Sequence, residues 1–210
     1  MKPFEQTALL LAGGSLSVTP RVLELVRNAQ LVIAADGGAR HAAPLSVTID
    51  LWVGDFDSSD DLAHITTPRQ TFPREKDKTD LELALGIAKT RGATRALVLG
   101  AFGGRFDHAL GIALMAARET RAGFTIHLES GTESGWVLTP AEPLELPLTA
   151  GQTFSVLALE EAVGLSIAGA KWPLERVRLA FGASLGISNE ARGVVSLSLE
   201  VGLALVIAQW

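Results

Sequence analysis

The chain has 210 residues, enough for one large domain or two small ones, and either can bury a core without disulfide bonds. It contains no cysteine, which excludes thiolate nucleophiles, cysteine-based zinc sites and disulfides. The formal net charge is −5 and no run of Lys or Arg stands out, which argues against a nucleic-acid partner. Mean hydropathy is +0.30, yet no stretch reaches the roughly 18 uncharged apolar residues of a membrane helix. We expect a cytoplasmic protein with no membrane contact.

Short apolar runs alternate with amphipathic segments up to residue 122, a pattern typical of βα units around a mostly parallel sheet. Strands are predicted at 7–12, 30–35, 50–53, 69–72 and 95–99. The first helix begins at Pro20, because proline is favoured at the first helical position, and runs to Arg27.

Two further helices are predicted in this half. One begins near Thr79, which forms a capping box with Glu82 and precedes apolar residues at helical spacing. The other covers 108–120, and its inward-facing residues are predicted to be Leu110, Leu114 and Ala117.

Helical periodicity fades after residue 122, and short runs of Val, Leu, Ile and Ser appear between Gly and Pro. The expected strands are 124–129, 134–138, 152–158, 163–168, 194–199 and 203–207. We therefore predict an α/β domain over 1–122, followed by an all-β, sandwich-like domain over 123–210.

The first candidate motif is Asp36-Gly37-Gly38, directly after an apolar run. A carboxylate at the carboxyl end of a parallel strand, followed by glycines that allow close backbone approach, lies where ligands bind in open α/β sheets. An ordinary Asp-Gly turn explains the same letters.

The second motif is Gly54-Asp55-Phe56-Asp57-Ser58, after another apolar run. Two carboxylates spaced i, i+2 in a tight loop can converge on one magnesium ion, which takes oxygen ligands from carboxylates and substrate phosphates. The alternative is that Asp57 or Ser58 caps a short helix, although capping would not require Asp55.

The third motif is Lys76-Asp77-Lys78-Thr79-Asp80, before the helix that carries Glu82. Acidic residues near a helix N-terminus are explained by the helix dipole alone. The two lysines are unfavourable there unless a phosphate or carboxylate lies nearby.

The fourth motif spans Gly100–His108 and includes Gly103-Gly104-Arg105-Phe106-Asp107. A glycine-rich turn followed by arginine can offer backbone amides and a guanidinium to a phosphate. An ordinary loop with Asp107 as the N-cap of the next helix is the alternative. His41, His64 and His127 are interpreted as surface or packing residues.

The four motifs follow successive strands, so they are expected at one edge of the sheet, in one crevice. Carboxylates together with Lys and Arg indicate a site where magnesium and a polyphosphate bind. The chain lacks the G-x-x-x-x-G-K-[ST] and G-x-G-x-x-G fingerprints, so neither a P-loop nor a dinucleotide site is supported.

In this order, the motifs resemble the catalytic domain of thiamine pyrophosphokinases. The second half is similar to that family's β domain at Lys171-Trp172-Pro173-Leu174 and Gly186-Ile187-Ser188-Asn189-Glu190. The resemblance implies a homodimeric, magnesium-dependent enzyme in which the thiamine hydroxyl attacks the β-phosphorus of ATP and AMP leaves.

The resemblance also implies roles for individual residues. The magnesium ligands would be Asp55, Asp57 and Asp80, and Arg105 would join them in catalysis. The surroundings of ATP would be Asp36, Gly37, Ser58, Lys76, Asp77, Thr79, Arg105 and Asp107. Trp172 would stack on thiamine, an interaction suited to a cationic ring, and Ser188 and Asn189 would contact its ring system.

The chain departs from the family pattern at Ala109 and Gly111, where the family usually has Thr and Asn. These changes motivate one alternative, a nucleotide- or thiamine-binding protein with impaired catalysis. A second alternative takes Asp55-Phe56-Asp57-Ser58-Ser59 as a phosphatase element with Asp55 as nucleophile. Its position after the third predicted strand argues against that alternative.

Overall fold

The computed structural model describes residues 6–56, 62, 64–73, 75 and 77–210. The chain divides into two compact units, the first formed by residues 1–115 and 124–131 and the second by residues 116–123 and 132–210. Among the described residues, no helix combines the length and apolar character that a membrane span requires.

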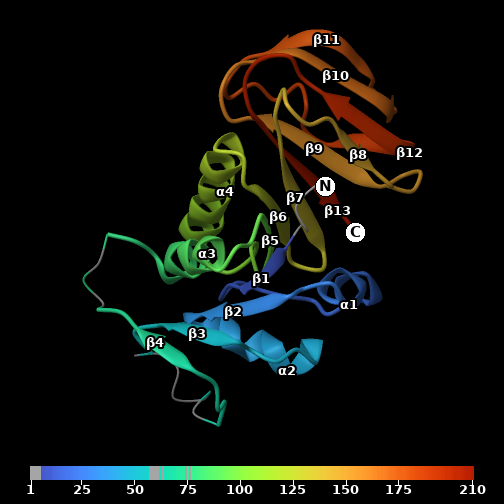
Figure 1. Cartoon of the computed structure of the whole chain (residues 1–210). Coiled ribbons are helices and arrows are strands. Elements are labelled where there is room, and N and C mark those ends of the chain that lie inside the picture. Colours follow the sequence, from blue (N-terminus) through green and yellow to red (C-terminus); the bar gives the residue numbers. More distant parts are fainter. Residues whose placement is uncertain (1–5, 57–61, 63, 74, 76) are drawn as a thin grey trace, which may run out of the picture. The chain divides into compact units, whose positions relative to one another are not determined.

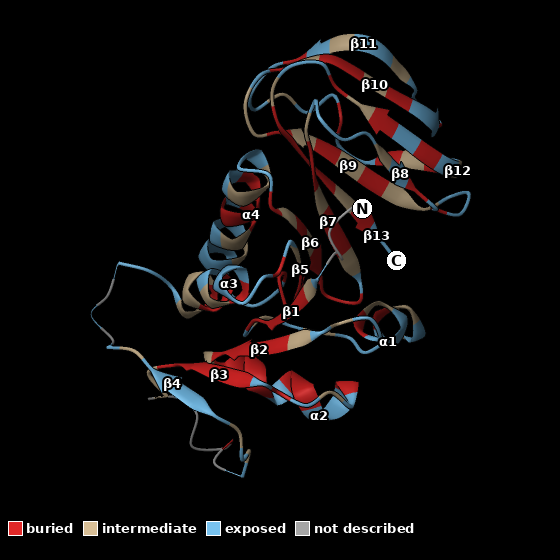
Figure 2. Ribbon diagram, viewed as in Figure 1, coloured by how far each residue is buried: buried red, intermediate tan, exposed pale blue. Residues whose placement is uncertain are grey.

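The first unit is built on a parallel sheet whose strands lie in the order β6-β5-β1-β2-β3-β4 (Figure 1). Their bounds are β1 Thr7–Leu11, β2 Leu31–Ala35, β3 Leu51–Gly54, β4 Arg69–Thr71, β5 Arg95–Leu99 and β6 Thr125–Glu129. β1, β2 and β3 are almost entirely buried, whereas β4 is exposed (Figure 2). Strand order reverses at β1, so a topological switch point lies between β1 and β5, where open α/β sheets bind ligands.

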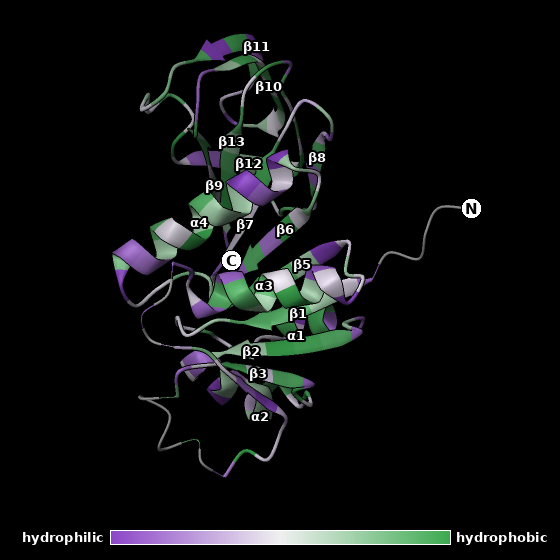
Figure 3. Cartoon of the chain, turned by 60° about the vertical axis from the view of Figure 1, so that its left-hand side comes forward, coloured by the Kyte–Doolittle hydropathy of each residue, from purple (hydrophilic) through white to green (hydrophobic). Residues whose placement is uncertain are grey.

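Helices cover both faces of this sheet. The bounds are α1 Pro20–Val26, the 3₁₀ helix η1 Asp36–His41, α2 Ala42–Leu45, α3 Asp80–Thr90 and α4 Phe106–Arg121. α1 and α2 share one apolar cluster with Leu9, Val32 and Trp52. α3 contacts β1, β2 and β3 but does not belong to that cluster. Because side chains alternate along a strand, α3 therefore covers the opposite face of the sheet. The strands beneath are strongly hydrophobic (Figure 3).

Two predictions about residues 106–129 are wrong. The run 124–129, expected to open the all-β domain, forms β6, which pairs in parallel with β5. In α4, Leu110 and Leu114 are 46% and 52% exposed, and only Ala117 of the predicted inward set is buried. The buried positions are Ala113, Met115, Ala116 and Ala117, three of which are alanines.

The second unit consists of antiparallel strands around one apolar cluster that includes Phe154, Val156, Leu165, Ile167 and Val195. The bounds are β7 Glu133–Leu138, β8 Leu144–Leu146, β9 Thr153–Ala158, β10 Ala162–Ala170, β11 Leu174–Leu179, β12 Asn189–Ser198 and β13 Ala204–Gln209. β13 pairs with β7 and β9, while β10 pairs with β11 and β12. β12 joins the two groups: Asn189 and Glu190 pair with β9, and later residues pair with β10 and β8.

Buried charge on β6 generates a prediction about pH. The Glu129 carboxylate is fully buried and accepts from Arg21 at 2.5 and 2.9 Å, and its Oε2 lies 3.8 Å from His127 Nε2. The His127 side chain is 22% exposed, but its Nε2 is buried. Burial, opposed by Glu129 and assisted by Arg21, lowers the pKa of His127 to about 4.

The unfolded chain therefore takes up this proton at a higher pH than the folded chain does. The stability that neutral His127 contributes is full above a pH of about 6.5 and is lost as the pH falls toward about 4. We expect a cost on the order of 2 kcal/mol at pH 5, which His127→Gln should remove. Urea unfolding of both proteins at pH 7 and pH 5 measures it. An NMR titration that gives His127 an ordinary pKa would contradict the prediction.

Candidate functional site

The first acidic motif forms the start of η1, at the carboxyl end of β2. Asp36 adopts φ 45°, in the left-handed region. Gly38 lies directly against β1, since a Cβ there would stand 2.0 Å from the carbonyl oxygen of Leu11. The motif therefore forms a tight 3₁₀ turn that lies directly against the central strand β1.

The second acidic motif follows β3 and lies beside the first. A Cβ on Gly54 would stand 3.3 Å from Asp36 Cα, so the two backbones are adjacent. The indole Nε1 of Trp52 donates to the Asp36 carbonyl at 2.8 Å. Asp55 is half-buried at the end of the strand, while Asp57 and Ser58 lie outside the described residues. Asp36 and Asp55 are thus brought to the same edge, as predicted.

The third motif leads into α3. Thr79 is the N-cap: its hydroxyl accepts from the Glu82 backbone N–H at 3.2 Å, and the Glu82 carboxylate accepts from the Thr79 N–H at 3.2 Å. The predicted capping box is confirmed, and it places Asp80 at the first helical position. Asp77 is exposed beside it, and Lys76 lies outside the described residues.

The fourth motif follows β5. Arg105 donates to Asp107 from Nε at 3.1 Å and from Nη2 at 2.6 Å, and both side chains are exposed. Through this pair, the pKa of Asp107 is lowered and the pKa of Arg105 is raised. The helix begins at Phe106, so Asp107 lies in its first turn and is not the N-cap considered above. The guanidinium is held in place, still open to solvent.

One part of this edge, the segment Gly13–Ser17 after β1, was not predicted from the sequence. Its backbone N–H groups bond across the switch point to the carbonyls of Gly100, Phe102 and Ser130. A Cβ on Gly14 would stand 2.3 Å from the Gly100 carbonyl oxygen, so a larger residue cannot fit. The signal available was a Gly-Gly pair after an apolar strand.

His41 forms a hydrogen bond with this segment. It is buried, and its Nε2 lies 3.0 Å from the carbonyl oxygen of Gly14, which can only accept, so Nε2 carries the hydrogen. Burial lowers the pKa of His41, which favours this neutral form. The packing role predicted for His41 is confirmed.

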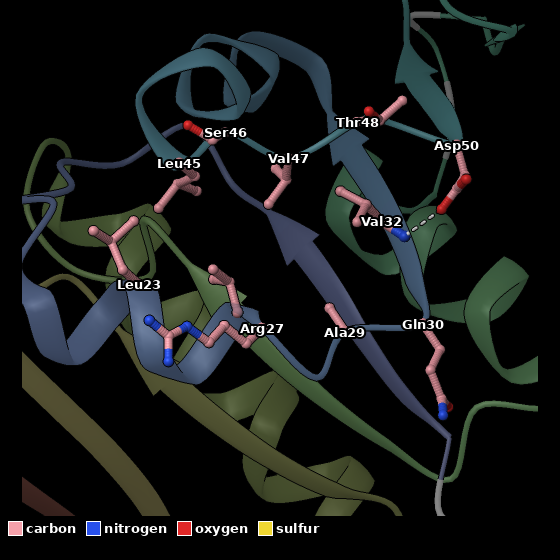
Figure 4. Close-up of a pocket in the computed structure, with 11 residues that line it drawn as sticks. Leu23, Arg27, Ala29, Gln30, Val32, Leu45, Ser46, Val47, Thr48 and Asp50 are labelled. Atoms are coloured by element: carbon pink, nitrogen blue, oxygen red, sulfur yellow. Dashed lines mark hydrogen bonds between the residues drawn. The ribbon is translucent and has the colours of Figure 1, made fainter.

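A cavity of about 480 Å³ lies elsewhere in the first unit. Leu23 and Arg27 reach into it from α1, and Leu45 and Val47 from the end of α2 (Figure 4). It opens at the amino ends of β2 and β3, where Asp50 accepts from the Val32 N–H at 2.8 Å. Ligands of open α/β sheets bind at the opposite edge, and none of the motif residues lines this cavity.

The donors at the carboxyl edge fit magnesium by their chemistry. Magnesium is commonly held by one or two carboxylates, with water and substrate phosphates completing the octahedron. Asp36, Asp55 and Asp80 supply carboxylates at this edge, although the described residues contain no ready-made cluster of three or more ligands. Such a site suits an ion that arrives with a polyphosphate.

The second unit presents a separate aromatic surface. Trp172 is 54% exposed, so it is not a core residue. The Lys171 ammonium lies 4.8 Å from its ring centroid and 3.0 Å from Glu190 Oε2. Asn189 is buried and fixes the Trp172 backbone, accepting from its N–H at 3.2 Å and donating to its carbonyl at 2.8 Å.

Ser188 lies next to this clamp in a left-handed conformation, with φ 58°, and its N–H donates to Ser155 Oγ at 3.0 Å. The structure therefore brings Trp172, Ser188 and Asn189 together, as predicted. The sequence could not show that the Asn189 amide is engaged by the main chain of Trp172.

Comparisons with known proteins agree with this arrangement. Residues 22–128 match the model of the thiamin pyrophosphokinase catalytic domain, and residues 143–204 match that of the thiamin pyrophosphokinase vitamin B1 binding domain. Thiamine pyrophosphokinase of Bacillus subtilis is 26% identical over 202 residues, which cover 92% of this chain and 94% of that protein.

Solved structures show the same fold. The crystal structure of the B. subtilis enzyme superimposes with a TM-score of 0.83 at 24% identity, covering 97% of this chain and 99% of that one. A thiamin pyrophosphokinase family protein from Enterococcus faecalis gives 0.77 at 26% identity, with 98% and 99% covered. With a catalytic-domain match that spans half of its length and the second domain matched as well, the chain belongs to the thiamin pyrophosphokinase family.

Proposed function

We propose that this protein transfers a pyrophosphoryl group from ATP to the hydroxyl of thiamine, giving thiamine diphosphate and AMP. The observation that carries the proposal is the meeting of the Asp36 and Asp55 loops at the carboxyl edge of a parallel sheet, in a chain whose two halves match the two family domains. We further propose that it acts as a cytoplasmic homodimer and that the second unit is a sandwich-type thiamine-binding and dimerisation domain.

In this proposal Asp55, Asp57 and Asp80 hold Mg²⁺, which, when bound, neutralises charge on the phosphate oxygens. Arg105, held by Asp107 and exposed, is available to the transferring phosphates. The other ATP-binding residues are Asp36, Gly37, Ser58, Lys76, Asp77, Thr79 and Asp107. Backbone amides of the glycine-rich turn before Arg105 are proposed to donate to the phosphate oxygens.

Thiamine is placed on the indole of Trp172, because an exposed aromatic face attracts a cationic ring. Lys171 already lies over that face at 4.8 Å, so the thiazolium and the ammonium compete for it unless Glu190 draws the lysine aside. Ser188 and Asn189 are proposed to contact the ring system, and Asn189 also fixes the Trp172 backbone.

The direct test is an assay of the purified protein with ATP, Mg²⁺ and thiamine. We expect AMP and thiamine diphosphate in equal amounts, with no AMP when thiamine is omitted. Phosphate release from simple monoesters would instead favour the phosphatase alternative. Binding of thiamine and ATP without turnover would favour the impaired binding protein suggested by Ala109 and Gly111.

The metal assignment predicts that Asp55→Asn lowers kcat/KM by about 100-fold or more, because a ligand charge is removed while the volume is kept. Steady-state kinetics over a range of Mg²⁺ concentrations measure the loss. Glu24→Gln, which removes an exposed carboxylate on α1, is the matched control and should keep wild-type rates. Equal rates in Asp55→Asn and wild type would refute the assignment.

The stacking assignment predicts that Trp172→Ala raises the KM for thiamine by about 3- to 30-fold, the range expected for a cation–π contact. The KM for ATP should change little, since the ring is assigned to thiamine alone. Trp210→Ala, which removes another partly exposed indole of the same unit, serves as the control. A KM for thiamine that rises equally in both variants would count against a specific role for Trp172.

A further inference from the structure

One fully buried side chain, Trp52, touches both acidic loops. Its Nε1 donates to the Asp36 carbonyl at 2.8 Å, and its ring meets the Phe56 ring edge-on, with centroids 5.0 Å apart at 88°. Phe56 directly follows Asp55 in the chain. A single indole therefore links the backbone of the first loop to the side chain that anchors the second.

Both contacts fall on residues in the left-handed region. Asp36 has φ 45° and Phe56 has φ 63°, a conformation disfavoured for residues with a Cβ. Such residues persist only where their surroundings over-determine them, and they gather at functional sites. The direction of Asp55 depends on whatever holds the next residue, Phe56, in this conformation.

Arg69, on the exposed edge strand β4, lies over both rings. In the β3–β4 pair it is the register partner of Trp52, whose N–H donates to the Pro68 carbonyl at 2.9 Å. The carbon at the centre of its guanidinium lies 4.4 Å from the centroid of the Trp52 ring and 5.2 Å from that of Phe56. A planar cation over two rings at once restrains them relative to each other.

We infer that Arg69 is a positioning residue for the metal-binding edge: by lying across Trp52 and Phe56, it maintains the left-handed turn that aims Asp55. This inference rests on the proposed function, because it assigns a purpose to the direction of Asp55. Arg69 itself touches neither metal nor substrate. Its effect passes through the two rings, so it should appear in metal affinity and leave thiamine binding unchanged.

The test compares Arg69→Met, which keeps the stem and loses the charge, with Arg69→Lys, which keeps the charge and loses the planar fork. Lys89→Met is the matched control, because it removes another cation over a ring, with Lys89 Nζ 4.9 Å from the centroid of Phe124. We expect Arg69→Met to raise the Mg²⁺ concentration for half-maximal activity about 3- to 30-fold, with the KM for thiamine unchanged. Arg69→Lys should fall between Arg69→Met and wild type, and Lys89→Met should match wild type.

Two readouts do not depend on turnover. Binding of Mn²⁺ in the presence of a non-hydrolysable ATP analogue, followed by electron paramagnetic resonance, should weaken by a similar factor in Arg69→Met. The indole N–H resonance of Trp52, assigned with Trp52→Phe, should shift and exchange faster with solvent, because the bond to Asp36 loosens. If Arg69→Met does not fold, Arg69→Lys provides the test: its Mn²⁺ affinity and its Trp52 indole resonance should change in the same direction by a smaller amount.

The inference fails if Arg69→Met melts earlier while Mn²⁺ affinity and the Trp52 resonance stay unchanged, since Arg69 would then only stabilise the sheet edge. It also fails if the wild-type protein binds no Mn²⁺ even when the ATP analogue is present. Weakened Mn²⁺ binding in Arg69→Met, in a protein that forms no thiamine diphosphate, would refute the proposed function and leave the positioning role standing.

Discussion

Backbone-to-backbone contact at the switch point is the constraint on which the first unit depends. Gly14 lies against the Gly100 carbonyl and Gly38 against that of Leu11, at separations that exclude any side chain. These contacts bring the loops after β1, β2 and β5 together without side chains between them. The buried His41 imidazole forms a hydrogen bond with the Gly14 carbonyl oxygen. The polar groups at the carboxyl edge of the sheet can lie close together because the loops that carry them have glycine where their backbones meet.

The two units hold their candidate residues by different means. In the first unit, an indole and a histidine bond to main-chain carbonyls of loops, so side chains fix backbone. In the second unit, the buried amide of Asn189 does the same for an exposed tryptophan. In both units a residue assigned to ligand binding has its backbone held by a buried side chain. Substitution of those buried side chains would change activity.

Much of the first unit could be predicted because its signals are local. The capping box of Thr79 and Glu82, proline at the start of α1 and the apolar strand runs each identify an element within a few residues. The partner of a strand is not a local property: the run that forms β6 has the same apolar letters whichever sheet it joins. The buried face of α4 was misjudged because its buried residues are mostly alanines, which the spacing of the large apolar residues does not reveal.

The site was predictable where the chemistry lies in the residue type and was not where it lies in the backbone. Asp36 and Asp55 were identified because carboxylates at the carboxyl ends of parallel strands lie where ligands of open α/β sheets bind. The segment Gly13–Ser17 and the link through Trp52 were missed, since a glycine pair and an apolar strand residue look the same with or without such a role. Asp57, Ser58 and Lys76 lie outside the described residues, and their roles remain predictions.

The shared strand β12 limits how the aromatic surface can vary. Its first two residues pair with β9, and its remainder pairs with β10 and β8. Asn189, which fixes the Trp172 backbone, is therefore the first residue of a strand whose later residues belong to the core. Replacing Asn189 would remove its bonds to the Trp172 backbone and also disturb its pairing with β9, so this strand residue is tied to the core. Changes in ligand preference are accordingly more accessible through the flanking segments 171–173 and 180–188 than through the strand itself.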